Sequence, residues 1–250
     1  MIVDSHAHLG FDQVFDEEFT EAELLAAQRD HGIDRTIVQP ALAHDLTVAR
    51  ACHDAIAALA EEYPGQFAGM ANPSPHLEPA DYRREMRRCV RELGFVGVKL
   101  NPLGHAVNPL GRAGREVFTT AADLGVPVMV HTGTGVPWSN PAMLGPLARG
   151  FPATPVILAH AGGGIHAAEA SILASEHDNV FLEVSWSAGF MVRRWVRTFG
   201  AERVMFGSDH ADNVTTELAK LRSLDLDQAD LAMVLGGTAA KVYDLAEGRG

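Results

Sequence analysis

The sequence predicts an α/β protein with the architecture of a (β/α)8 TIM barrel. Short β-branched apolar runs alternate with longer amphipathic stretches, and eight such pairs follow one another within 250 residues. Many of the apolar runs are continuous, as in parallel strands that helices cover. Several runs end directly at His or Asp, at the strand ends where a barrel carries its active site.

Each predicted strand is an apolar run that ends near a polar or turn-forming residue. The strands are expected at 2–4, 35–40, 66–72, 95–101, 126–131, 155–160, 179–185 and 203–209. Amphipathic stretches predict helices between them, at 17–31, 46–63, 78–93, 112–124, 141–149, 164–177, 189–200 and 213–223. Two more helices, at 227–235 and 238–246, are expected outside the barrel or across its bottom.

The alternative architecture is a doubly wound open sheet. The barrel is favoured because there are eight strand–helix units and no GxGxxG follows the first apolar run. We see no linker, low-complexity tract or shift in composition, so residues 1–250 are expected to form a single domain.

Composition narrows the range of partners. The formal net charge of -12 disfavours nucleic acid and anionic membranes. Apolar runs are all shorter than the roughly 18 residues of a membrane span. Two cysteines, Cys52 and Cys89, lie in helix-like stretches and no signal peptide precedes them, so a reduced, cytoplasmic protein is expected.

Histidine and aspartate at the strand ends predict a metal site. His6 and His8 share one face of the first strand because side chains alternate along a strand. His131, His160 and Asp209 follow the fifth, sixth and eighth runs, and in a barrel all these ends meet at one mouth. Imidazoles and a carboxylate around an open position suit a divalent ion such as zinc.

Six segments together make the chain resemble the amidohydrolase superfamily, in particular the branch that includes aminocarboxymuconate-semialdehyde decarboxylase and related hydrolases. They are VDSHAHLG, GFVGVKLNP, VPVMVHTG, VILAHAGG, RVMFGSDH and VLGGTAAKVYDL. The resemblance implies one catalytic metal on His6, His8, His131 and Asp209. It also implies that His160 acts as an acid/base or orients the attacking water. The chain departs from the branch at GGTAA, usually GxNA, and at Asn101, often His.

These residues predict a metal-dependent hydrolase. A bound ion lowers the pKa of water from ~15.7 to about 7, so that hydroxide attacks a carbonyl-type carbon of an amide, lactone or related carboxylic derivative. Asp209 is the expected base and His160 the second acid/base. The alternatives are a non-oxidative decarboxylase (a lyase) of a small aromatic or unsaturated acid, and a metal-binding barrel without catalytic activity. Hydrolysis is preferred because a decarboxylase needs a cation for the substrate carboxylate, and only Lys99, Arg112 and Arg115 are near strand ends.

The cofactor is expected to be one Zn²⁺ per chain, with Mn²⁺, Fe²⁺ and Co²⁺ as alternatives. A carboxylated Lys99 would instead bridge two ions. Candidate contacts to a small-molecule substrate are Lys99, Asn101, Asn72, Trp138 and Trp186. At the end of 179–185, Ser185 or Trp186 is expected to face the site, and His53 is expected on an exposed helix face. A homodimer is compatible with the apolar outer helices.

Overall fold

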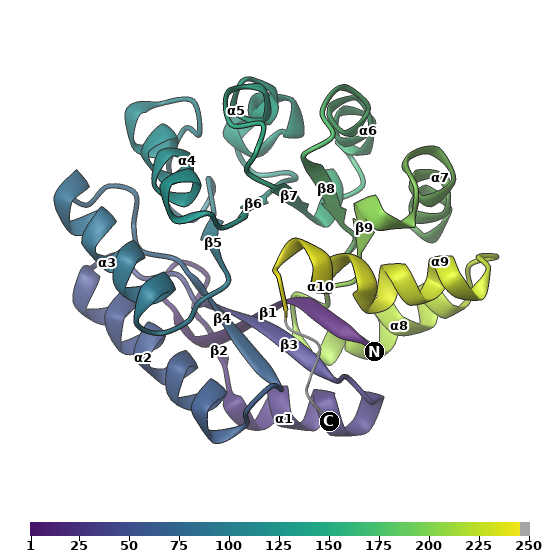
Figure 1. Ribbon diagram of the computed structural model, residues 1–250, viewed down its shortest axis with the longest axis horizontal. Helices are drawn as coiled ribbons and strands as arrows, with labels where there is room; N and C mark the ends of the chain where they lie inside the picture. Colours follow the sequence, from purple (N-terminus) through teal and green to yellow (C-terminus); the bar gives the residue numbers. More distant parts are fainter. Residues whose placement is uncertain (246–250) are drawn as a thin grey trace.

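The computed structural model describes residues 1–245, which form a curled nine-stranded sheet surrounded by helices (Figure 1). The strand order is β2-β1-β3-β4-β5-β6-β7-β8-β9, and every neighbouring pair is parallel except β1 with β2. The strands are β1 Val3–Asp12, β2 Glu17–Phe19, β3 Arg35–Pro40, β4 Phe67–Ala71, β5 Gly97–Leu100, β6 Val128–His131, β7 Val156–Ala159, β8 Val180–Glu183 and β9 Val204–Met205. The eight predicted strands are therefore β1 and β3–β9, in the predicted order.

Backbone hydrogen bonds join the first strand to the segment after the last. Ser5 N–H donates to Phe206 O at 3.1 Å, and Asp209 N–H donates to His6 O at 2.7 Å. This contact brings the two ends of the curled sheet together and confirms the predicted barrel.

Helices pack on the outside of the ring of strands (Figure 1). Their bounds are α1 Glu21–His31, α2 Leu46–Glu62, α3 Pro79–Arg91, α4 Arg112–Leu124, α5 Gly145–Gly150, α6 Ala167–Glu176, α7 Gly189–Phe199, α8 Val214–Arg222, α9 Gln228–Ala232 and α10 Thr238–Val242. Local sequence explains several starts: Thr20 and Glu23 form a capping box on α1, and the Asp45 side chain accepts two backbone N–H groups at the start of α2.

Two apolar clusters stabilise the barrel. The larger lies between the strands and the outer helices. The smaller fills the end of the barrel away from the strand carboxyl ends, where Ile37, Met129 and Met205 meet Ala239 and Tyr243. The C-terminal segment containing α10 thus covers the bottom of the barrel, which was one of its two expected positions, and leaves the opposite mouth for polar side chains.

The structure differs from the prediction near the N-terminus. Residues 17–19 form β2, antiparallel to β1, where a helix from residue 17 was predicted. The helix begins only at Glu21, because the Thr20 cap sets its start. The first strand, predicted at 2–4, continues to Asp12 because β2 pairs with its last residues. At the other end, residue 246 of the predicted 238–246 helix lies outside the described residues.

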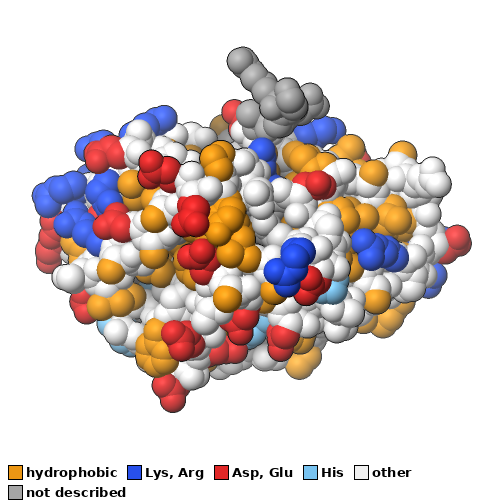
Figure 2. All heavy atoms as spheres, turned by 90° about the horizontal axis from the view of Figure 1, so that it is seen from below, with side chains coloured by type: hydrophobic (Ala, Val, Ile, Leu, Met, Phe, Trp, Pro, Cys, Tyr) orange, Lys and Arg blue, Asp and Glu red, His pale blue; other side chains and the backbone are white. Residues whose placement is uncertain are grey.

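The surface carries mixed charge. On the face drawn in Figure 2, acidic side chains are spread among apolar and neutral ones. Across residues 1–245, no helix is both long enough and apolar enough to cross a membrane.

Candidate metal centre

The first strand delivers His6 and His8 to the mouth of the barrel. Its pairing with β3 shifts register between Asp4 and Ala7. The shift lets Val3 pack in the interior cluster at the bottom while His6, three residues later, faces the interior at the top. The Asp4 side chain supports this irregular stretch by accepting from Ser208 N (2.9 Å) and Ser208 Oγ (2.6 Å). Burial raises the pKa of Asp4 to about 7.

Three predicted ligands converge at this mouth. Asp209 Oδ1 lies 3.0 Å from His6 Nε2 and 3.3 Å from His8 Nε2, and the two Nε2 atoms are 3.2 Å apart. Ligand atoms about 2.0–2.1 Å from a tetrahedral ion are separated by roughly 3.3 Å. The three atoms are therefore spaced as a divalent ion requires, and the donor set suits it.

The electrostatics favour the metal-binding protonation states. Burial, with a contribution from the Lys99 charge, lowers the pKa of His6 well below its usual value. Burial alone would raise the pKa of Asp209, but the neighbouring His6, His160 and His8 hold it well below its usual value. A neutral imidazole and an ionised carboxylate are the forms that bind metal.

Glu183 at the end of β8 orients His6, a role that the sequence reasoning missed. Glu183 Oε2 accepts from His6 Nδ1 at 2.9 Å and from His160 N–H at 3.0 Å, and the carboxylate is fully buried. A proton on Nδ1 puts the lone pair of the ring on Nε2, the nitrogen that a metal would bind. The signal available in the sequence was an acid inside the apolar run NVFLEVS, two residues before Ser185 on the same strand face.

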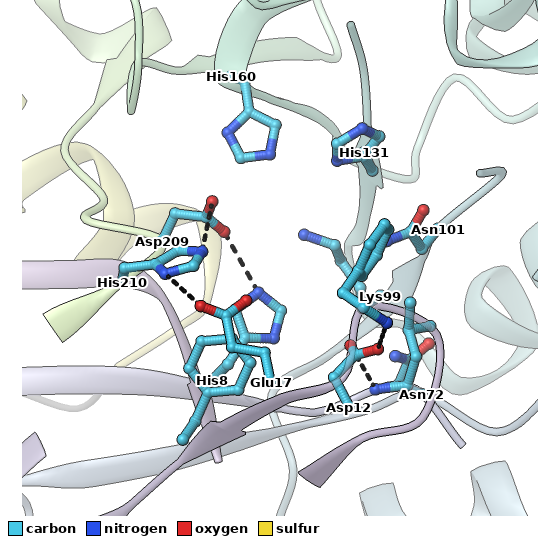
Figure 3. Close-up of a pocket in the computed structure, with 13 residues that line it drawn as sticks. His8, Asp12, Glu17, Asn72, Lys99, Asn101, His131, His160, Asp209 and His210 are labelled. Atoms are coloured by element: carbon cyan, nitrogen blue, oxygen red, sulfur yellow. Dashed lines mark hydrogen bonds and ion pairs between the residues drawn. The ribbon is translucent and has the colours of Figure 1, made fainter. Parts of the chain in front are cut away.

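His131 and His160 line the same pocket, opposite the His8 side (Figure 3). The His160 ring centroid is 4.9 Å from that of His131 and 5.1 Å from that of His6. His160 Nδ1 lies 2.8 Å from Ser185 Oγ, and burial lowers the pKa of His160 to about 4. Burial likewise lowers the pKa of His131 well below its usual value. The structure thus places all five predicted site residues at one mouth, with His6, His8 and Asp209 in the closest group.

The five predicted substrate contacts divide into two groups. Asn72, Lys99 and Asn101 line the pocket. Lys99 Nζ is buried 2.8 Å from His6 Nε2, and burial lowers the pKa of Lys99 to about 8. Trp138 and Trp186, both among the described residues, are not part of its lining.

The hairpin of β1 and β2 completes the pocket, and sequence reasoning did not anticipate it. Phe15, Glu17 and Phe19 contribute to its wall, with Asp12 at the turn. Asp12 Oδ1 accepts from the N–H groups of Val14 and Phe15, each at 2.9 Å, which fixes the turn. The pocket is partly open to solvent, so a small molecule can reach it.

A buried hydrogen-bond network of His53 and Glu85 holds the backbone of Asn72. Asn72 N–H donates to His53 Nε2 at 3.1 Å, so the proton of the ring is on Nδ1, which donates to Glu85 Oε1 at 2.9 Å. Arg50 and Arg88 also donate to Glu85. The expectation of an exposed His53 is therefore wrong: its side chain has no exposed surface, because its two ring nitrogens bridge α3 and the end of β4.

Three strand ends at the mouth adopt a left-handed backbone without glycine. His160 has φ 64°, Trp186 φ 59° and Asp209 φ 67°. Such residues cost roughly 1–3 kcal/mol each and cluster at functional sites. The strain directs these side chains to one mouth from β7, β8 and β9.

Comparisons with known proteins find matches over most of this chain. A family model described as amidohydrolase matches residues 3–245. The 2-keto-4-carboxy-3-hexenedioate hydratase of Sphingobium sp. is 32% identical over 184 residues, which are 59% of this chain and 53% of the hydratase. The match therefore spans about half the length of that enzyme. The gamma-resorcylate decarboxylase of Rhodococcus jostii is 23% identical over 262 residues, 80% of this chain and 77% of that enzyme.

Solved structures share the fold. The 5-carboxyvanillate decarboxylase of Sphingomonas paucimobilis has a TM-score of 0.76 at 18% identity, with 97% of this chain and 98% of that chain covered. A dihydroxybenzoic acid decarboxylase from Polaromonas sp. JS666, with manganese and the inhibitor 2-nitroresorcinol bound, has a TM-score of 0.79 at 19% identity, covering 98% and 97%.

The prediction of a hydrolase is wrong. The relatives described above are decarboxylases and a hydratase, so they favour the decarboxylase alternative over attack of water on an amide or lactone. The residues that predicted hydrolysis are the proposed metal ligands, and one kind of ligand set serves several reactions on one fold. The family model covers almost the whole described chain, and the metal-binding geometry lies at the mouth of the barrel. The chain therefore belongs to the amidohydrolase family and is an enzyme of that superfamily.

Proposed function

We propose that the chain is a metal-dependent lyase that removes carbon dioxide, without oxidation, from a small aromatic or unsaturated carboxylic acid. The observation that carries this proposal is Lys99, a buried cation in the pocket wall 2.8 Å from a ligand nitrogen. Among the residues that line the pocket in the described chain, it is the one Lys or Arg. Arg112 and Arg115 do not line it, so the cation that a decarboxylase needs comes from Lys99.

His6, His8 and Asp209 would hold the metal, with His131 as the proposed fourth ligand. A divalent ion bound there supplies Lewis acidity that polarises an oxygen of the substrate. We propose a single ion. Zinc was expected from the donor set, and manganese is bound in a structural neighbour, so both loaded forms need to be compared.

The chain's own residues account for binding and proton movement. Lys99 holds the substrate carboxylate, and Asn72 and Asn101 can hydrogen-bond further polar groups. The Asp209 carboxylate takes an acidic proton from the substrate. When the bond to the carboxylate carbon breaks, its electron pair stays on the substrate carbon, and Asp209 returns the proton there. His160, held by Ser185, orients the substrate on the opposite side.

Hydration is a second candidate, because the relative with the higher identity, 32%, is a hydratase. There Asp209 would take a proton from water, and a C–O and a C–H bond would form across a substrate double bond. The same pocket cation would bind a carboxylate of that substrate. The two reactions differ in their products, since only decarboxylation releases carbon dioxide.

The test is a substrate panel on protein loaded separately with Zn²⁺ and Mn²⁺. The panel contains 5-carboxyvanillate and 2,6-dihydroxybenzoate (gamma-resorcylate) for decarboxylation, and an unsaturated keto acid for hydration. Carbon dioxide release, with deuterium from heavy water at the vacated carbon, would support decarboxylation. Loss of the double-bond absorbance without carbon dioxide would favour hydration. An inert panel with metal bound would reject the proposal for these substrate classes.

Two substitutions test whether the activity depends on Asp209. Asp209→Asn is expected to abolish turnover, whereas Asp225→Asn, on an exposed side chain, should leave it unchanged. Equal activity of Asp209→Asn and wild type would remove Asp209 from the reaction.

We further propose a cytoplasmic, homodimeric protein. Both cysteines are free thiols, which supports a reducing compartment.

An apolar groove between α6 and α7 supports contact between two copies. It is flanked by Ile172, which is 58% exposed, and Phe190, which is 66% exposed. Sedimentation of the wild type and Phe190→Asp would test the dimer, which is rejected if both are monomeric.

A further inference from the structure

Trp186 faces the metal ligand Asp209. Its indole Nε1–H donates to Asp209 Oδ2 at 2.8 Å, and its ring meets the His210 ring edge-on at a centroid distance of 5.9 Å. The side chain is 53% exposed, so it is not required to fill the core. The contact follows from the left-handed backbone of Trp186, which turns the side chain toward β9 after β8 ends.

The two oxygens of the Asp209 carboxylate have different neighbours. Oδ1 faces the Nε2 atoms of His6 and His8, at 3.0 and 3.3 Å, and Oδ2 faces Trp186. An indole N–H can only donate, and it neither ionises nor binds a cation. Trp186 therefore holds Oδ2, which also lies 3.6 Å from His210 Nε2, so that Oδ1 is directed at the two imidazoles, and a second lone pair of Oδ2 remains for a proton. Hydrogen bonds of this kind to a ligating carboxylate set its orientation toward a metal.

Helix α8 holds the strained turn in place. Trp186 N–H donates to Glu217 Oε1 at 2.9 Å, and Glu217 is 2% exposed. Lys220 pairs with the other oxygen of Glu217 and also donates to Val184 O at 2.9 Å. A strained residue whose backbone is held by a buried carboxylate is the arrangement expected where backbone strain serves a site.

We propose that Trp186 is a positioning residue: it fixes Asp209 for one-oxygen ligation, with Glu217 as its anchor, and so strengthens ion binding. The inference rests on the proposed metal site but not on the reaction catalysed there. It replaces the expected role of Trp186 as a substrate contact, since its donor is already engaged by Asp209.

The test compares Trp186→Phe with wild type and with Trp138→Phe, a half-buried loop tryptophan that does not line the pocket. Phenylalanine keeps the ring and removes only the donor. Equilibrium dialysis with Mn²⁺ and Zn²⁺ should show about tenfold or greater loss of affinity in Trp186→Phe and wild-type affinity in Trp138→Phe. Circular dichroism and thermal unfolding check that both variants fold.

A second measurement is independent of activity. Saturating Co²⁺ should quench tryptophan fluorescence in the wild type and in Trp138→Phe, and the quench should be much smaller in Trp186→Phe. A KM increase with unchanged metal affinity in Trp186→Phe would overturn the inference in favour of a substrate contact. Wild-type protein that binds no divalent ion would overturn both this inference and the proposed metal site. Metal binding that is weakened in Trp186→Phe, with no activity on any substrate, would support the inference while rejecting the proposed reaction.

Discussion

Glu183 and His6 form a fully buried pair across the mouth of the barrel, with Glu183 Oε2 2.9 Å from His6 Nδ1. The pair sets the ring orientation of a proposed metal ligand from a strand that carries no ligand itself. The same oxygen accepts from the backbone of His160, so one carboxylate organises two sides of the pocket.

Replacement of Glu183 by Gln is expected to weaken metal binding by about 10–100-fold, because both carboxylate oxygens accept hydrogen bonds and an amide NH₂ can take the place of neither. The fold should lose about 2 kcal/mol or more, since a buried hydrogen-bonded charge is removed. Metal titration and thermal unfolding measure both effects. The control is Glu61→Gln, an exposed residue of α2. Unchanged metal affinity in Glu183→Gln would show that His6 needs no such support.

Alanine substitutions of His131 and His160 should have different effects on metal content and turnover. His131→Ala is expected to reduce the metal content of the purified protein, because we propose His131 as the fourth ligand. His160→Ala should retain metal and lose at least about 100-fold in turnover, the scale of a missing acid/base or orienting group. Metal analysis beside kcat distinguishes the two. The opposite pattern, with metal lost only in His160→Ala, would reverse the assignment.

Lys99→Met is expected to raise KM for a carboxylate substrate by about 10–100-fold, the loss of a charged hydrogen bond. Metal content should be unchanged, because Lys99 is not a proposed ligand, and stability should not fall, because a buried charge is replaced by an apolar chain of similar length. Steady-state kinetics at saturating metal test this, with the exposed Lys241→Met as control. An unaltered KM would exclude Lys99 as the carboxylate anchor.

Stability should depend on pH through Glu85. Burial alone would raise the pKa of Glu85, but hydrogen bonds from His53, Arg88 and Arg50 hold it well below the ordinary value of 4.5. A carboxyl whose pKa is lower in the folded state contributes stability above its unfolded pKa and loses that contribution as pH falls toward the folded pKa. The melting temperature of the wild type should therefore drop as pH falls below about 4.5.

The matched variant Glu85→Gln should be about 3 kcal/mol less stable at pH 7, because His53, Arg50 and Arg88 lose the buried carboxylate that accepts their hydrogen bonds. Its melting temperature should change less than that of the wild type when the pH falls from about 5 to about 3. Glu62→Gln, exposed at the end of α2, serves as control. Parallel pH profiles for all three proteins would contradict the assignment of this dependence to Glu85.

Local pattern was sufficient for much of the fold and for grouping the proposed ligands. The continuous apolar runs identified all eight parallel strands, because strands covered on both faces need apolar residues throughout. The His and Asp residues after those runs could be grouped because parallel strands end at one side of a barrel. The hairpin strand at 17–19 was missed because three half-exposed residues carry no periodic signal.

The sequence alone therefore determined the barrel, the amidohydrolase resemblance and the group of histidines and Asp209 at the strand ends, since each depends on spacing along the chain. Only the tertiary structure decided which side chains meet: the Asp4–Ala7 register shift that brings Val3 and His6 to the interior, Glu183 behind His6, and Trp186 on Asp209 rather than in the pocket. These contacts join residues far apart in the chain, such as the 177 positions between His6 and Glu183, and depend on strand register and backbone strain. A one-residue difference in register turns a side chain to the other face of a strand, so such partners are set by the packed barrel as a whole.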